Sequence, residues 1–179
     1  MTTLDSRALE AFPSWLKSLA EDAQRLAALL EQPDAAPAAR RAAALSLNYL
    51  FKSLDLIPDG LEDLGFIDDA FVLRAAAALV DEAERTEELA ELAAQAALIE
   101  EFLGSDYPRL LRYVKNQEDG RARGRSVSEI LADDATRADF TREVGQWAAG
   151  YAAPSFARDT RSLVKLRSFL ATRLPPEST

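Results

Sequence analysis

Apolar residues recur at intervals of three and four along most of the chain, and this spacing is typical of amphipathic α-helices. The first such run follows Pro13, and the second occupies residues 37–54, where apolar positions surround nearly the whole circumference. We therefore expect the second helix to lie at the centre of a bundle. A third helix is predicted to begin at Asp68 or Asp69 and to continue through an alanine-rich stretch.

Signals of helix ends punctuate the rest of the pattern. Thr86 is predicted to cap a fourth helix that Gly104 ends, because a threonine oxygen can accept from free N–H groups and glycine readily follows a last turn. Ser126 and Glu129 have the spacing of a capping box, which predicts another helix start. A last amphipathic helix is expected within residues 157–174.

Composition favours the same fold. Alanine, leucine, glutamate and arginine dominate, whereas only 7 of the 179 residues are glycine, and this balance favours helix over strand. We expect an all-α protein: a multi-helix bundle of about six to eight helices. It should form one compact domain with a C-terminal helical extension.

Charge divides the chain into two parts. Residues 1–104 carry 8 basic and 20 acidic side chains, a net charge of −12, whereas residues 105–179 carry 13 and 10, a net of +3. The first part is read as an acidic bundle, residues 105–174 as a mildly basic extension docked on it, and residues 175–179 as a tail. Because the net charge of −9 repels phosphate backbones, we expect no nucleic-acid partner.

The missing residue types exclude several kinds of chemistry. The chain has no histidine and no cysteine, which removes Ser-His-Asp and Cys-His nucleophile systems and the usual zinc ligands. The N-terminal stretch is polar and carries Asp5 and Glu10, unlike a signal peptide, so a soluble cytoplasmic protein is expected. No catalytic base or nucleophile can be identified without assuming a metal ion, and we do not expect an enzyme.

One stretch, "LNYLFKSLDLIPDGLEDLGFIDDAFVLRAAAAL", carries a motif. It consists of a tyrosine, a D-L-I-P-D turn, a glycine and paired aspartates: Tyr49, Asp55, Pro58, Asp59, Gly65, Asp68 and Asp69. Over about residues 42–80 the chain resembles the small bacterial YkvA-like helical domain, a family of unknown function. The resemblance implies a helical fold rather than an activity. The family usually has an apolar residue and a second proline where this chain has "GLEDL".

Each motif residue has a structural interpretation. Pro58 should stop the helix that carries Tyr49, since proline disfavours α conformation in the residue before it. Gly65 can adopt a positive φ. Asp68 suits an N-cap, and Asp69 in the first turn would be favoured by the helix dipole. The Tyr49 hydroxyl is expected to point at one of these carboxylates.

A metal site is the alternative interpretation of the same carboxylates. Asp55, Asp59, Asp68 and Asp69 could surround one Mg²⁺, Mn²⁺ or Ca²⁺ ion, because hard cations prefer oxygen ligands. Such a site could serve a hydrolase that acts on a phosphoester or nucleotide. The spacing matches neither the calcium loop nor the D-D-x-x-D pattern of diphosphate-binding helical enzymes, and we prefer the capping interpretation, with no cofactor.

Three functions therefore stay open at this stage. The favoured one is a non-catalytic module that binds another protein or itself, since local chemistry accounts for the motif. The second is the metal-dependent hydrolase. The third is a peripheral membrane protein, which would need an exposed apolar patch on the second helix, made of Leu47, Leu50, Phe51 and Leu54. Membrane contact is not favoured.

Overall fold

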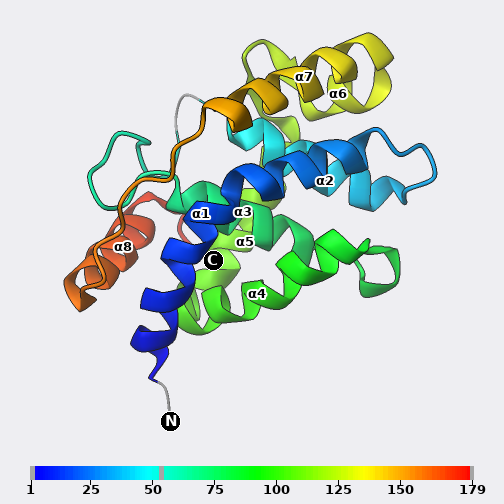
Figure 1. Cartoon of the computed structure of the whole chain (residues 1–179). Helices are drawn as coiled ribbons and strands as arrows, with labels where there is room; N and C mark the ends of the chain where they lie inside the picture. The colour runs from blue at the N-terminus through cyan, green and yellow to red at the C-terminus, as the bar shows by residue number, and fades with distance from the viewer. Residues whose placement is uncertain (1–2, 53–54, 178–179) are drawn as a thin grey trace.

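The computed structural model describes residues 3–52 and 55–177, and they form an all-α bundle (Figure 1), as predicted. The helices are α1 (Leu4–Leu30), α2 (Pro37–Tyr49), α3 (Ile67–Ala78), α4 (Glu87–Leu103), α5 (Tyr107–Lys115), α6 (Val127–Ala132), α7 (Asp134–Gly150) and α8 (Thr160–Arg173). Short 3-10 turns are η1 (Glu82–Glu84), η2 (Gly104–Asp106) and η3 (Asn116–Asp119). Strands β1 (Arg121–Ala122) and β2 (Arg125–Ser126) pair antiparallel as a small hairpin.

Helix α1 begins earlier than the sequence pattern predicts. Thr3 is its N-cap and accepts a hydrogen bond from the backbone N–H of Ser6 at 3.1 Å, so Pro13 lies inside the helix. A proline in a helix interior costs about 3 kcal/mol. Ala8 and Phe12 are both fully buried, and this burial before the proline explains why packing outweighs its cost.

Helix α2 is shorter than predicted. It ends at Tyr49, and the chain then tightens into turns in which Leu50 and Phe51 donate to carbonyls three residues back. The prediction that Pro58 ends this helix is therefore wrong. The last residue of the predicted helix, Leu54, lies outside the described residues.

The centre of the bundle is α3, which is buried from Ile67 to Ala77. It packs against α1, α2, α4 and α5. Phe12 of α1 meets Phe71 of α3 and Phe102 of α4 edge to face, each at 5.0 Å between ring centroids. The sequence placed α2 at the centre; α2 is also largely buried, but α3 has no exposed face over these residues.

The C-terminal part of the chain packs on the N-terminal bundle. Helix α7 lies along α1, α6 packs on α2, and α8 lies against α1 (Figure 1). Phe156 contributes a ring 6.2 Å from that of Phe12. The Tyr151 hydroxyl donates to the carbonyl of Leu16 at 2.7 Å, and Arg167 pairs with Asp5 at 3.2 Å.

Several predicted helix ends are confirmed. Thr86 caps α4, which Gly104 ends with a φ of 56°. Ser126 and Glu129 form the predicted capping box at the start of α6. In the described residues, no helix combines the length and apolarity needed to cross a membrane.

Candidate functional site

The motif forms a hydrogen-bonded junction between the end of α2 and the start of α3. Tyr49 is buried, and its hydroxyl donates to Oδ2 of Asp68 at 2.7 Å while accepting from the backbone N–H of Leu56 at 2.9 Å. The backbone N–H of Ile57 donates to the same Oδ2 at 3.2 Å. We call Tyr49, Asp68 and these two backbone groups the clasp. It confirms the prediction that the Tyr49 hydroxyl meets a carboxylate.

The prediction that Asp68 is the N-cap of α3 is wrong. The N-cap is Phe66, whose φ is 64° and whose side chain makes no capping bond, and Asp68 and Asp69 lie in the first helical turn. The reason is that the chain enters α3 through a left-handed residue. Asp68 instead accepts from Tyr49 and from the preceding turn, so its carboxylate joins two segments rather than ending one.

Gly65 is required for close packing and not for a positive φ. The positive φ values of this turn belong to Asp63, at 71°, and Phe66. A Cβ atom on Gly65 would lie 2.1 Å from the carbonyl oxygen of Asp59. Any larger residue would therefore force the turn away from α3. The predicted reason for this glycine is wrong.

The clasp borders three aspartates, of which Asp68 and Asp69 are buried and Asp55 is half-buried near the Lys52 ammonium. Asp68 is 0% exposed and Asp69 1%. One oxygen each of Asp55, Asp68 and Asp69 is buried and has no hydrogen-bond partner in the described part of the chain. The ammonium group of Lys52, also near Asp55, is bonded to the Tyr113 hydroxyl and to a glutamine. We call these three aspartates the acid cluster.

Burial controls the protonation of the acid cluster. Loss of solvation, together with the charge of Asp68, raises the pKa of Asp55 to about 7. Burial raises the pKa of Asp68 to about 6, although the bonds from Tyr49 and Ile57 oppose the shift. Burial and the adjacent Asp68 raise the pKa of Asp69 well above its usual range. The cluster can therefore hold protons near neutral pH.

The four predicted metal ligands differ in their exposure. Asp68 and Asp69 are buried, Asp55 is half-buried, and Asp59 is exposed with its neighbour Pro58. Within residues 3–52 and 55–177, no three acidic side chains are placed to hold a metal ion together. Among the described residues, the side chain of Asp59 accepts no hydrogen bond from a backbone N–H group, whereas Asp68 accepts one from Ile57.

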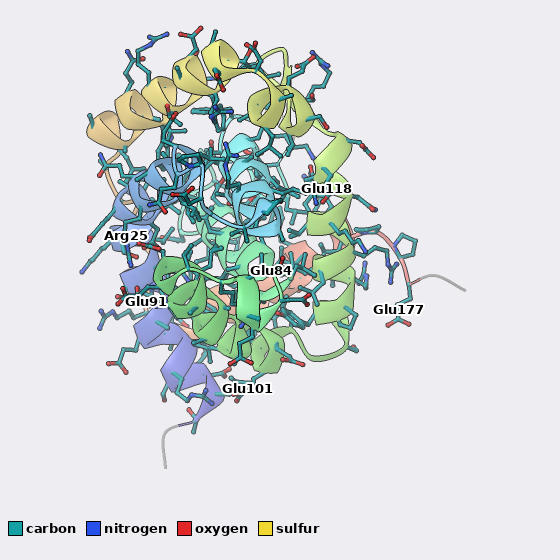
Figure 2. The ribbon with its side chains drawn as sticks, turned by 90° about the vertical axis from the view of Figure 1, so that its right-hand side faces the viewer. Arg25, Glu84, Glu91, Glu101, Glu118 and Glu177 are labelled. Atoms are coloured by element: carbon teal, nitrogen blue, oxygen red, sulfur yellow. The ribbon has the colours of Figure 1, made fainter. Side chains whose placement is uncertain are left out.

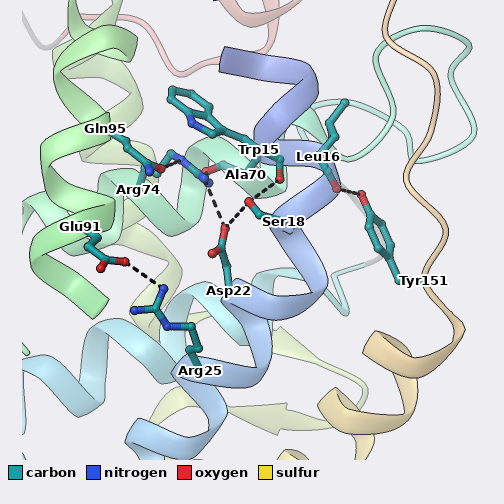
Figure 3. A network of polar contacts seen from close by, with 10 residues as sticks. All are labelled: Trp15, Leu16, Ser18, Asp22, Arg25, Ala70, Arg74, Glu91, Gln95 and Tyr151. Carbon is teal, nitrogen blue, oxygen red and sulfur yellow. Dashed lines mark hydrogen bonds and ion pairs between the residues drawn. The ribbon is translucent and has the colours of Figure 1, made fainter. Parts of the chain in front are cut away.

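Sequence reasoning missed a second buried charged group, centred on Arg74 (Figure 3). Arg74 is 1% exposed and its guanidinium lies 4.3 Å from the Trp15 ring. It donates to Gln95 at 2.8 Å, to the carbonyl of Ala70 at 3.0 Å and to Asp22 at 3.3 Å. The sequence signal that could have revealed this group is a lone arginine in an apolar, alanine-rich stretch. Through these bonds Arg74 links α3 to α1 and α4.

A surface cleft opens where α2, the end of α3, η1 and α5 meet. Its volume is about 230 Å³. The apolar lining residues are Ala38, Ala42, Leu45, Ala76, Leu79, Val80 and Val114, and the charged ones are Arg41, Asp81, Glu84, Lys115 and Glu118. Figure 2 looks onto this side of the molecule, where Glu84 and Glu118 are labelled. Sequence reasoning did not single out this cleft.

The apolar patch required for membrane contact is not formed by the residues named for it. Leu47 is fully buried, and Leu50 and Phe51 are also buried, with 6% and 7% exposed. They pack into the core with their neighbours on α2. Leu54 lies outside the described residues.

Comparison with known families gives one match. The family described as "Protein of unknown function (DUF1232)" matches residues 39–75, which contain nearly all of α2, the turn with the clasp, and most of α3. Comparison with curated proteins and with solved structures gives no significant match. Residues 39–75 are therefore similar to an uncharacterised family, and the match leaves the larger part of the chain outside it.

Proposed function

We propose that this chain is a non-catalytic helical module that binds a protein partner through the cleft between α2, α3 and α5. The observation that carries the proposal is an apolar floor open at the surface, with the side chain of Leu79 43% exposed. Leu79 directly follows the buried helix α3, so an exposed apolar side chain lies next to the core at this point. Such a position suits an anchor contact with another protein.

The size and lining of the cleft favour a protein side chain over a metabolite. Pockets for small ligands usually enclose about 300–1,000 Å³, and this cleft is smaller, at about 230 Å³. Its residues offer no hydroxyl, thiol or imidazole group. An apolar floor with charged residues around it matches the core and rim of a protein interface.

The clasp supports this function by fixing the walls of the cleft. Tyr49 and Asp68 join the end of α2 to the start of α3, and these helices pack against each other along their length. Ala38, Ala42 and Leu45 on α2 face Ala76 and Leu79 at the end of α3. A change in the angle between the two helices would therefore change the cleft.

Site-specific cross-linking tests the proposal. A photo-reactive amino acid is placed at Leu79 in the full chain, and in a matched protein at Lys17, an exposed position on α1 outside the cleft. Irradiation in the cells that produce the protein should give a discrete adduct from position 79 and none from position 17. The adduct should weaken when Ala38→Trp fills the cleft.

Two results would contradict the proposal. One is an adduct pattern from position 79 that equals the pattern from position 17. The other is an adduct whose yield does not change with Ala38→Trp in a protein that melts normally. Mass spectrometry of a discrete adduct identifies the partner.

A further inference from the structure

Two large apolar side chains are exposed in the described structure, and they lie on different parts of the molecule. Leu79 is 43% exposed at the cleft, and Val164 is 60% exposed on α8. We propose that the occupant of the cleft is α8 of a second copy of this chain, with Val164 against Leu79. This inference rests on the proposed function and names its partner.

The charge of α8 complements that of the cleft. Between Thr160 and Arg173 the helix carries four basic side chains and no acidic one. Arg161 and Lys165 flank Val164 on the exposed face, and Lys165 forms no ion pair within the described residues. The Arg161 guanidinium is bonded to Asp159 at the start of the helix.

The surface around the cleft is predominantly acidic. Three acidic residues, Asp81, Glu84 and Glu118, line it beside two basic ones. The neighbouring Glu82 and Asp119 are also exposed. Glu91 and Glu101, on the same side of the molecule in Figure 2, are paired with Arg25 and Arg7, so the acidic residues at the cleft itself carry the complementarity. Opposite charges favour encounter and set the orientation of a contact.

The contact must form between two molecules. Helix α8 lies against α1, on the side away from the open ends of α2 and η1 that border the cleft (Figure 1). Its inner face is held by Leu163, Leu166 and Leu170, which are buried, so α8 cannot leave its own bundle without exposing them. Its outer face, with Val164, is free to meet another chain.

The resulting assembly is head to tail. The cleft and the outer face of α8 are different surfaces. When two molecules associate, the cleft of one and the α8 face of the other therefore stay unoccupied. Such contacts continue into an open chain or close into a ring. A helix of 14 residues is about 21 Å long. A single helix face in a small cleft makes a limited interface, so we expect association that depends on protein concentration and weakens with salt.

A complementation experiment tests this directly. Leu79→Arg blocks the cleft, and Val164→Glu blocks the α8 face; both positions are exposed, so both variants should melt like the parent. Sedimentation of the full chain over about a hundredfold range of concentration should show growing oligomers for the parent. Each variant alone should stay monomeric. Their equal mixture should form a dimer that grows no further, because one cleft and one α8 face remain intact.

Lys17→Glu, a charge reversal on α1 outside both surfaces, should associate like the parent. A parent protein that is monomeric throughout, or a mixture that yields no dimer, overturns this inference. Oligomers in both single variants overturn it as well. Cross-linking from Leu79 to a different protein would leave the proposed function standing while the self-association is rejected.

Discussion

At the scale of single residues, Asp69 is a carboxyl group whose burial works against folding at neutral pH. Burial raises the pKa of Asp69 well above its usual range, that of Asp68 to about 6 and that of Asp55 to about 7. A folded state with raised pKa values binds protons more tightly than the unfolded chain, whose aspartates have a pKa of about 4. The contribution to stability is therefore complete below about pH 4 and is lost as the pH rises through the folded values.

We predict from this that Asp69→Asn stabilises the protein at about pH 8, by ~1 kcal/mol or more, because the amide keeps the shape without the charge. The parent should lose stability between about pH 5 and about pH 8, and the variant should lose less. Urea unfolding at both pH values measures the effect. Glu62→Gln, at an exposed acid of the same turn, is the control. A variant less stable than the parent at the higher pH would contradict the prediction.

Tyr49→Phe removes one oxygen from the clasp and keeps the ring. It leaves the Leu56 N–H without a bond inside the protein and removes one of the two hydrogen bonds to Asp68 Oδ2, the other being donated by Ile57. We expect a loss of ~1–3 kcal/mol in the free energy of unfolding, measured with denaturant. Tyr113→Phe, at a half-buried tyrosine whose hydroxyl accepts from Lys52, should cost less. Equal losses in the free energy of unfolding for the two variants would show that the clasp stabilises the protein no more than the Tyr113 hydroxyl does.

The residues of the motif could be predicted in part. The tyrosine–carboxylate contact followed from one polar group at the end of an apolar helix and paired acids at the start of the next. The roles of Asp68 and Gly65 did not follow. They depend on the left-handed conformation of Phe66 and on the approach of the Asp59 carbonyl, and neither is encoded by residue type or spacing.

At the scale of elements, Arg74 couples three helices. Its guanidinium carries the buried ion pair with Asp22 and the bond to Gln95. Arg74→Met should destabilise the fold by ~3 kcal/mol or more, because it leaves the Asp22 carboxylate without its charged partner. The double variant Arg74→Met with Asp22→Leu should recover part of that loss. A double-mutant cycle in denaturant measures the coupling, and additive losses would refute it.

The two helix ends that meet at the clasp also give a prediction about cations. An ion present at a hundred times its dissociation constant adds about 2.7 kcal/mol to stability. Since no three acids of the described ranges share a point, we expect the melting temperature of metal-stripped protein to stay unchanged with Mg²⁺, Mn²⁺ or Ca²⁺. A rise with one ion, absent in Asp68→Asn, would restore the metal interpretation of the motif.

Prediction of the elements succeeded where a signal is local. Capping residues such as Thr86 and the Ser126–Glu129 pair mark helix starts through their own side chains. It failed where tertiary packing decides, as at Pro13, which lies within a helix whose flanking residues are buried. The end of α2 likewise follows from the turn after Tyr49 rather than from the later proline.

At the scale of the whole molecule, one apolar core joins residues from both parts of the chain. Phe156, Leu163 and Leu166 belong to it together with Phe12. We predict that a fragment of residues 1–104 unfolds without cooperativity. We also predict that it binds a hydrophobic dye, because its contact surface for α7 and α8 is uncovered. Calorimetry and dye fluorescence test this. Cooperative unfolding of the fragment would identify it as an independent domain.

The helical class of the molecule was readable from periodicity and composition, but the cleft was not. Leu79 ends an alanine-rich run in which every position looks like core. Leu79 lines a cleft between α2, the end of α3 and α5, and that arrangement depends on contacts between residues far apart in sequence. Val164 is exposed because it lies off the buried face that Leu163, Leu166 and Leu170 form on α8.

The two oxygens of Asp68 have separate tasks. Oδ2 accepts from both Tyr49 and Ile57, so it is already fully engaged as an acceptor. A proton taken up by this carboxyl group therefore resides on Oδ1, the oxygen without a partner. One oxygen of the side chain joins the two segments, and the other, also buried, can carry the proton. The charge of the acid cluster can thus change with pH while the ends of α2 and α3 stay joined.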